Sequence, residues 1–126
     1  MNNPQSHILY IEDHEDTRDL VTLVLAESNH RVTSTSNGKE ALKLAREHQF
    51  DLYILDSWLA DGTGIELCQR LREFDHGTPI MFFSGAAYET DKQAALENGA
   101  QCYLVKPADI KIFRDQVNAL IGDSSE

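Results

Sequence analysis

Short apolar segments of strand length recur along the chain at 7–11, 31–35, 51–55, 79–83 and 101–105. Four of them are apolar without a clean alternation, as expected of strands that are buried on both faces of a sheet. The segment RVTST at 31–35 instead mixes valine with threonine and serine. This composition predicts an exposed edge strand.

Amphipathic segments separate the apolar ones and predict helices over 16–28, 38–48, 63–74, 89–99 and 109–122. In the first helix, Leu20 and Val24 fall on the expected buried stripe. In the last helix, Ile110 and Phe113 do the same. The helix at 89–99 is mostly polar, with a thin alanine and leucine seam, so it has the least burial to hold it in place.

Strand and helix thus alternate five times, which predicts a parallel sheet with helices on both faces. A chain of 126 residues is the size of one compact domain. We therefore expect a single domain over 1–126, with a core at about 7–122 and short polar tails. The sequence shows no internal repeat and no linker.

Charge and composition argue against several classes of protein and partner. The 21 acidic residues outnumber the 11 basic ones and give a formal charge of −10, which disfavours binding to nucleic acids and to anionic membranes. The longest apolar stretches fall short of the roughly 20 residues of a membrane span, and the N-terminal residues lack the pattern of a signal peptide. Cys68 and Cys102 form no metal-binding pattern, so we expect reduced thiols and a cytoplasmic protein.

Charged and hydroxyl side chains follow four of the predicted strands. Glu12 and Asp13 follow the first, Asp56 the third, Ser84 the fourth and Lys106 the fifth. In doubly wound sheets, functional groups gather at the carboxyl ends of the strands. The sequence therefore predicts that these side chains meet at one edge of the sheet.

We expect such a cluster of acids to bind a cation. Two carboxylates about 4 Å apart repel each other by about 4 kcal/mol at an effective dielectric constant near 20, unless one is protonated or a metal ion lies between them. Carboxylate oxygens suit Mg²⁺. Together with Ser84 and Lys106, the cluster could hold a phosphoryl group for attack by an aspartate, which gives an acyl phosphate.

Simpler interpretations exist for each residue taken alone. Asp13 could cap the helix that follows it, and Lys106 or Ser84 could belong to ordinary turns. Coincidence explains the combined set of strand ends less well. Other functions on this fold lack their motifs: the chain has no P-loop, its acidic first loop would repel a flavin phosphate, and Trp58 occupies the place of the second acid expected in an aspartyl-phosphate phosphatase.

The ordered set resembles the receiver domain of bacterial two-component response regulators. The matching stretches are YIEDHEDTRDL, LYILDSWLADGTGIEL, PIMFFSGA and GAQCYLVKP, and they cover nearly the whole chain. The resemblance implies a flavodoxin-like sheet of five parallel strands in the order 2-1-3-4-5, with helices on both faces. That order agrees with the polar, edge-like strand at 31–35.

The resemblance also implies a role for each residue of the set. Asp56 would accept the phosphoryl group, while Ser84 and Lys106 would contact its oxygens. Mg²⁺ would be held by Glu12, Asp13, Asp56 and the backbone carbonyl of Trp58, with Glu12 standing where aspartate is commoner. Tyr103 would be the aromatic residue that switches rotamer on activation.

A receiver of this kind would take its phosphoryl group from a sensor histidine kinase or a phosphotransfer protein and would signal to a downstream protein target. It would be primarily a switch that catalyses its own phosphorylation and dephosphorylation at Asp56. The face formed by the fourth helix, fifth strand and fifth helix, marked by Tyr103 and Ile112, is the expected partner surface and a candidate homodimer interface. The alternative is a degenerate receiver that binds proteins without phosphorylation.

Overall fold

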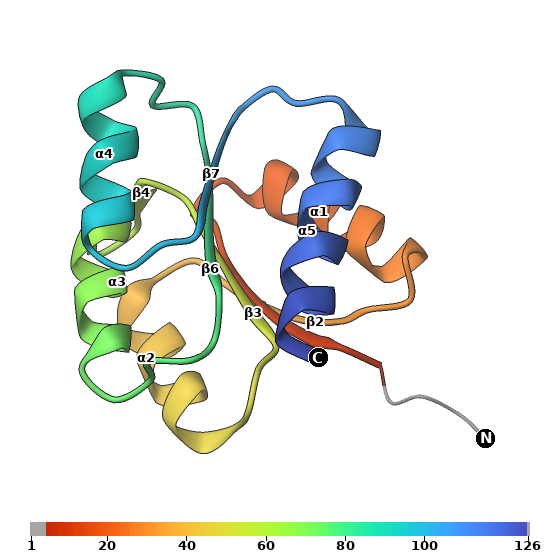
Figure 1. Cartoon of the computed structure of the whole chain (residues 1–126), viewed down its shortest axis with the longest axis horizontal. Helices are drawn as coiled ribbons and strands as arrows, with labels where there is room; N and C mark the ends of the chain where they lie inside the picture. The colour runs from red at the N-terminus through yellow and green to blue at the C-terminus, as the bar shows by residue number, and fades with distance from the viewer. Residues whose placement is uncertain (1–4, 126) are drawn as a thin grey trace.

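A computed structural model of the chain describes residues 5–125, and the side chains of residues 5–122. Its centre is a parallel five-stranded sheet in the order β2-β1-β3-β6-β7, with the fold shown in Figure 1. The strands are β1 (His7–Ile11), β2 (Arg31–Thr35), β3 (Leu52–Leu55), β6 (Ile80–Ser84) and β7 (Cys102–Val105). This confirms the predicted order 2-1-3-4-5 and places the polar strand at an edge.

The five helices cover both faces of the sheet. They are α1 (Glu15–Glu27), α2 (Gly38–Glu47), α3 (Gly64–Arg72), α4 (Glu89–Glu97) and α5 (Ile110–Ser125). Helices α1 and α5 lie on one face, and α2, α3 and α4 lie on the other (Figure 1). None of the helices within residues 5–125 is both long and apolar enough to cross a membrane.

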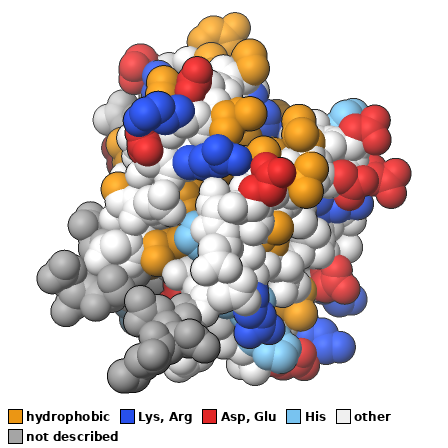
Figure 2. Space-filling model, turned by 90° about the vertical axis from the view of Figure 1, so that its right-hand side faces the viewer, with side chains coloured by type: hydrophobic (Ala, Val, Ile, Leu, Met, Phe, Trp, Pro, Cys, Tyr) orange, Lys and Arg blue, Asp and Glu red, His pale blue; other side chains and the backbone are white. Residues whose placement is uncertain are grey.

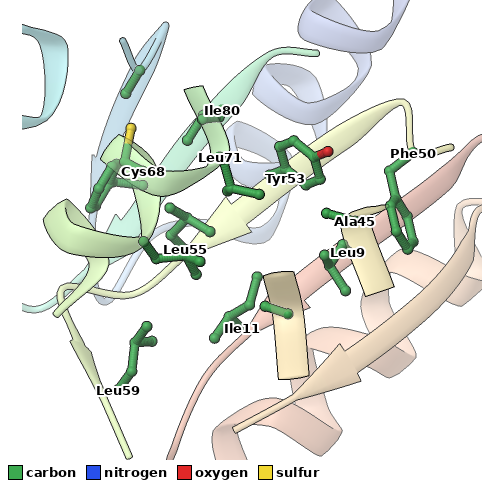
Figure 3. Close-up of a cluster of buried hydrophobic side chains, with 14 of the residues drawn as sticks. Leu9, Ile11, Ala45, Phe50, Tyr53, Leu55, Leu59, Cys68, Leu71 and Ile80 are labelled. Atoms are coloured by element: carbon green, nitrogen blue, oxygen red, sulfur yellow. The ribbon is translucent and has the colours of Figure 1, made fainter. Parts of the chain in front are cut away.

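A separate hydrophobic core lies on each face because successive side chains of a strand point to opposite sides. Leu9 and Ile11 of β1 belong to the core under α2, α3 and α4, drawn in Figure 3. Ile8 and Tyr10 of the same strand belong to the core under α1 and α5. All four are completely buried, which explains why the central strands show no alternation of apolar and polar residues.

On the predicted buried stripes of α1 and α5, Leu20 and Ile110 are exposed. Leu20 retains 61% of its surface and Ile110 retains 53%. Leu20 lies roughly 90° around α1 from the centre of its buried stripe, and Ile110 is the first residue of α5, so no earlier turn covers it. Both line a cavity of about 280 Å³ between α1 and α5, on the side of the molecule where hydrophobic side chains gather in the upper half of Figure 2.

The helix termini also differ in detail from the prediction. His14, not Asp13, caps α1, because its ring nitrogen accepts a hydrogen bond from the Thr17 backbone N–H at 3.2 Å. Asp13 is exposed and remains available to the acidic cluster. Helix α5 continues to Ser125, beyond the expected stop at Gly122.

A small hairpin that the hydrophobic pattern did not predict connects β3 to α3. Its strands, β4 (Trp58–Leu59) and β5 (Gly62–Thr63), pair in antiparallel fashion. Thr63 then forms a capping box with Glu66 at the start of α3. The hairpin and the capped helix together fix the loop that follows Asp56.

Gly64 allows α3 to begin directly against the end of β3. A Cβ atom at this position would lie 2.1 Å from the backbone oxygen of Asp56 and 2.9 Å from the ring of Phe82. Real Cβ atoms do not approach backbone so closely, so only glycine permits this packing. The close approach keeps the N-terminus of α3 beside Asp56.

Gly64→Ala is therefore expected to lower the free energy of unfolding by about 3 kcal/mol, at the upper end of the cost of overpacking. Gly77→Ala is the matched control, since a Cβ there would have no neighbour within 4 Å. Urea denaturation of both variants measures the difference. Equal stability of the two variants would show that Asp56 and α3 are not packed as described.

Candidate functional site

Four of the predicted side chains meet at the carboxyl edge of the sheet. The register pairs Ile11 with Leu55 and Ser84 with Val105, so the residues that follow these strands emerge close together. Glu12, Asp13 and Asp56 each offer a carboxylate oxygen within 4.8 Å of the others. The ammonium group of Lys106 bonds to Glu12 Oε1 and lies 3.3 Å from Asp56 Oδ2. The predicted convergence is therefore present for the acids and the lysine.

Glu12 is the most deeply buried residue of the cluster, with only 1% of its surface exposed. Its carboxylate accepts hydrogen bonds from the Tyr10 hydroxyl at 3.1 Å and the His14 backbone N–H at 3.2 Å. Burial raises the pKa of Glu12 above its usual value; the hydrogen bond from Lys106 opposes this shift, and the nearby charge of Asp56 adds to it. Glu12 is thus held in place and is sensitive to the charge around it.

Asp56 stands at the end of the buried strand β3 and is 9% exposed. Its Oδ1 accepts a hydrogen bond from the Ser57 backbone N–H at 2.7 Å, while its Oδ2 faces Lys106. Lys106 is held level with Ser84 because its backbone N–H donates to the Ser84 carbonyl at 2.8 Å. These contacts fix the orientation of the Asp56 carboxylate, which lies close to both the lysine and the other two acids.

Ser84 has a different environment from the acids. It is 1% exposed, and its hydroxyl donates to Ser57 Oγ at 2.7 Å. Tyr103 lies close by: its ring stacks on Phe82 with an interplanar angle of 7°, and its hydroxyl donates to the Ala86 carbonyl at 2.6 Å. Ser84 and Tyr103 are therefore linked to the cluster through Ser57.

Trp58 lies two residues after Asp56 and begins the hairpin strand β4. Its indole side chain is 66% exposed, so it covers little of the core. Together with Ser57 and Ala94 it lines a cavity of about 160 Å³ between the hairpin and α4.

The donor set fits a hard divalent cation. Glu12, Asp13 and Asp56 provide only oxygen ligands, and Asp13 is exposed, which gives an ion access and room for water. One ammonium group cannot neutralise three carboxylates, so a positive ion would relieve the remaining repulsion. The arrangement can hold an anionic group only when such positive charge is supplied.

Comparison with known proteins identifies the family to which this chain belongs. The sequence profile of the response regulator receiver domain matches residues 8–118 of this chain. The chain belongs to the response regulator receiver domain family. The receiver is 33% identical over 116 residues to the response regulator ArlR of Staphylococcus aureus, across 92% of this chain and 52% of ArlR. It thus spans about half the length of the curated relatives it matches.

Solved structures share the fold of this receiver. A two-component response regulator from Clostridium difficile is 27% identical, with a TM-score of 0.89 over 94% of this chain and 97% of that one. The receiver domain of the sensor histidine kinase PA1611 from Pseudomonas aeruginosa, solved with a magnesium ion coordinated in its active site cleft, is 23% identical with a TM-score of 0.87 over 94% and 99% of the two chains. At that identity the likeness shows the fold alone. The predicted family and fold are confirmed.

Ser57 is the residue of this receiver site that reasoning from sequence missed. Asp56 is the first residue after its predicted strand, and this position identified it as a candidate. Ser57 is the second residue after the strand and was not identified. The available signal was a second polar side chain at the end of a strand that is otherwise completely buried. Its importance depends on contacts with Ser84 and Tyr103, which lie 27 and 46 residues away in the chain.

Proposed function

We propose that this receiver takes a phosphoryl group onto Asp56 from a sensor histidine kinase or a phosphotransfer protein, with Mg²⁺ as cofactor. The observation that carries the proposal is the position of Asp56. Its carboxylate is nearly buried, accepts a hydrogen bond from the Ser57 N–H, and lies close to both the Lys106 ammonium and two further acids. A carboxylate oriented in this way can act as a nucleophile.

The transfer is a single displacement at phosphorus. A carboxylate oxygen of Asp56 forms the new P–O bond while the bond from phosphorus to the donor breaks. The electron pair leaves with the donor, an imidazole nitrogen in a phosphohistidine or a carboxylate oxygen in acetyl phosphate. Lys106 pairs with the phosphoryl oxygens, and Ser84 donates a hydrogen bond to one of them.

The proposed ligands of Mg²⁺ are the carboxylates of Glu12, Asp13 and Asp56, with the backbone carbonyl of Trp58 as a further ligand. Support comes from the mutual approach of the three acids to within 4.8 Å and from the oxygen-only donor set. Mg²⁺ supplies positive charge that offsets the charge of the phosphoryl oxygens. Lys106 also attracts those oxygens and already balances part of the charge of Glu12.

The proposed output surface is the face formed by α4, β7 and α5. Within the described residues, α4 buries only Ala95, so it is held less firmly than the other helices. Leu96 and Ile112 are exposed to 50% and 51% on α4 and α5. We propose that Tyr103 of β7 is the switch residue that alters this face for a downstream protein target, or for a second copy of the chain, in the cytoplasm.

Addition of Mg²⁺ is expected to stabilise the protein against unfolding, because an ion that binds only the folded cluster shifts the unfolding equilibrium. At ten times its dissociation constant, the gain is about 1.4 kcal/mol. Asp13→Asn should lose most of this gain, and in EDTA it should be more stable than the wild type because one repulsion is removed. Thermal scans in Mg²⁺ and in EDTA measure both effects.

Asp19→Asn is the matched control for the loss of one charge, since Asp19 is exposed on α1 and does not belong to the acidic cluster. It should keep the full stabilisation by Mg²⁺. If Asp13→Asn also kept the full stabilisation, the proposed metal ligands would be wrong.

Incubation with acetyl phosphate tests the proposed function. With Mg²⁺, the intact mass of the protein should rise by one phosphoryl group, and EDTA should prevent the rise. A protein that gains no mass from acetyl phosphate or from any phosphorylated kinase would instead be a receiver that acts by contact alone.

A further inference from the structure

Three hydroxyl groups form a hydrogen-bonded ring between the acceptor strand and the switch residue. Ser84 Oγ donates to Ser57 Oγ at 2.7 Å, Ser57 Oγ lies 3.2 Å from the Tyr103 hydroxyl, and that hydroxyl donates to the Ala86 carbonyl at 2.6 Å. The backbone N–H of Ala86 then donates to Ser84 Oγ at 3.1 Å and closes the ring.

Counting hydrogens fixes the direction of the ring. A hydroxyl group has one hydrogen to donate. Tyr103 gives its hydrogen to the Ala86 carbonyl, so Ser57 must be the donor in the contact with Tyr103. Ser84 gives its only hydrogen to Ser57. Every hydroxyl in the ring is therefore already committed, and Ser84 has no hydrogen left for a phosphoryl oxygen.

We propose that Ser57 is a positioning residue that competes with the phosphoryl group for the Ser84 hydrogen and couples this competition to Tyr103. The inference rests on the proposed function of Asp56. When Ser84 donates to a phosphoryl oxygen, Ser57 loses its donor and the ring opens. Hydrogen bonds in a chain polarise one another, so the loss reaches the bonds of Tyr103.

The position of Ser57 suits this role. Its backbone N–H holds Asp56 Oδ1 at 2.7 Å while its side chain joins the ring, so one residue contacts both the acceptor and the switch. Ser57→Ala removes the hydroxyl and leaves the backbone bond to Asp56 in place. Ser57→Thr keeps the hydroxyl, and the adjoining cavity of about 160 Å³ leaves room for its methyl group.

Removal of the Ser57 hydroxyl group is expected to have two effects. Ser57→Ala should take the phosphoryl group from acetyl phosphate and Mg²⁺ about 2- to 10-fold faster than the wild type, the range that one neutral hydrogen bond supports. Its Tyr103 should respond to phosphorylation by less than half the wild-type change. Ser57→Thr should restore both wild-type values.

NMR spectra of protein with ring-¹³C tyrosine, recorded with and without acetyl phosphate and Mg²⁺, measure the response of Tyr103. The chain has four tyrosines, so Tyr103→Phe assigns the signal. Tyr53, whose hydroxyl donates to Asp75 at 2.6 Å and belongs neither to the ring nor to the proposed output face, is the internal reference. Intact mass is recorded on the same samples. A full Tyr103 response in phosphorylated Ser57→Ala overturns the role of Ser57, whatever its rate. Absence of any mass gain in the wild type would instead reject the proposed function, and this inference with it.

Discussion

Asp56→Asn is expected to abolish the uptake of a phosphoryl group from acetyl phosphate or from a kinase. The amide of asparagine lacks the negative charge and the nucleophilic oxygen that form the acyl phosphate. Glu12 is not expected to replace Asp56, since its carboxylate is buried against Lys106 and Tyr10. Intact mass after incubation with Mg²⁺ and acetyl phosphate measures the loss.

Asp115→Asn is the matched control for this substitution. Asp115 forms an exposed ion pair with Lys111 on α5, at 2.7 Å, and is not part of the acidic cluster. This variant should take up the phosphoryl group as the wild type does. Phosphoryl uptake by Asp56→Asn at the wild-type level would place the acceptor elsewhere.

Lys106→Met is expected to slow phosphorylation by about 10²–10³-fold, the usual cost of losing a group that stabilises charge in a transition state. It should also lower the free energy of unfolding at neutral pH by about 3 kcal/mol, because the buried carboxylate of Glu12 loses its ammonium partner. That figure is the lower end of the usual range, since the lysine side chain is 21% exposed.

The stability loss in Lys106→Met should depend on pH in a defined direction. Burial already raises the pKa of Glu12, and removal of the ammonium raises it further. An acid with a raised pKa in the folded state binds more protons folded than unfolded, so stability falls as pH rises. The difference in free energy of unfolding between Lys106→Met and the wild type should therefore be small below about pH 4.3, the ordinary pKa of glutamate. It should grow toward neutral pH.

Urea denaturation in EDTA at several pH values measures this dependence. Lys92→Met, which removes an ammonium from a surface pair with Glu89 at 3.8 Å, should change stability by no more than about 1 kcal/mol. A deficit in Lys106→Met that is the same at acid and neutral pH would show that Glu12 does not depend on Lys106.

The fold could be predicted from sequence because its signals are local. The strand Leu52–Leu55 is a continuous apolar run, and the polar composition of 31–35 indicated a strand at an edge of the sheet. The exposure of Leu20 could not be predicted in the same way. Its helical spacing is compatible with the stripe, and only the packing of α1 against the sheet decides which edge of the stripe is covered.

The acidic part of the site could also be predicted, because the ends of parallel strands share one edge. Glu12, Asp56 and Lys106 meet there as expected. The partners of Ser84 could not be predicted, because they depend on side-chain directions across β3, β6 and β7. Ser57 is adjacent to Asp56 in sequence, yet its side chain bonds to Ser84 and approaches Tyr103.

The most direct test is to locate the phosphoryl group. Protein phosphorylated with acetyl phosphate and Mg²⁺ is treated with borohydride, which reduces an aspartyl phosphate to homoserine, and its peptides are then sequenced. Homoserine at position 56, and at no other aspartate, is the predicted result. A phosphorylated protein with homoserine at another position, or with none, would contradict the assignment of Asp56 as the acceptor.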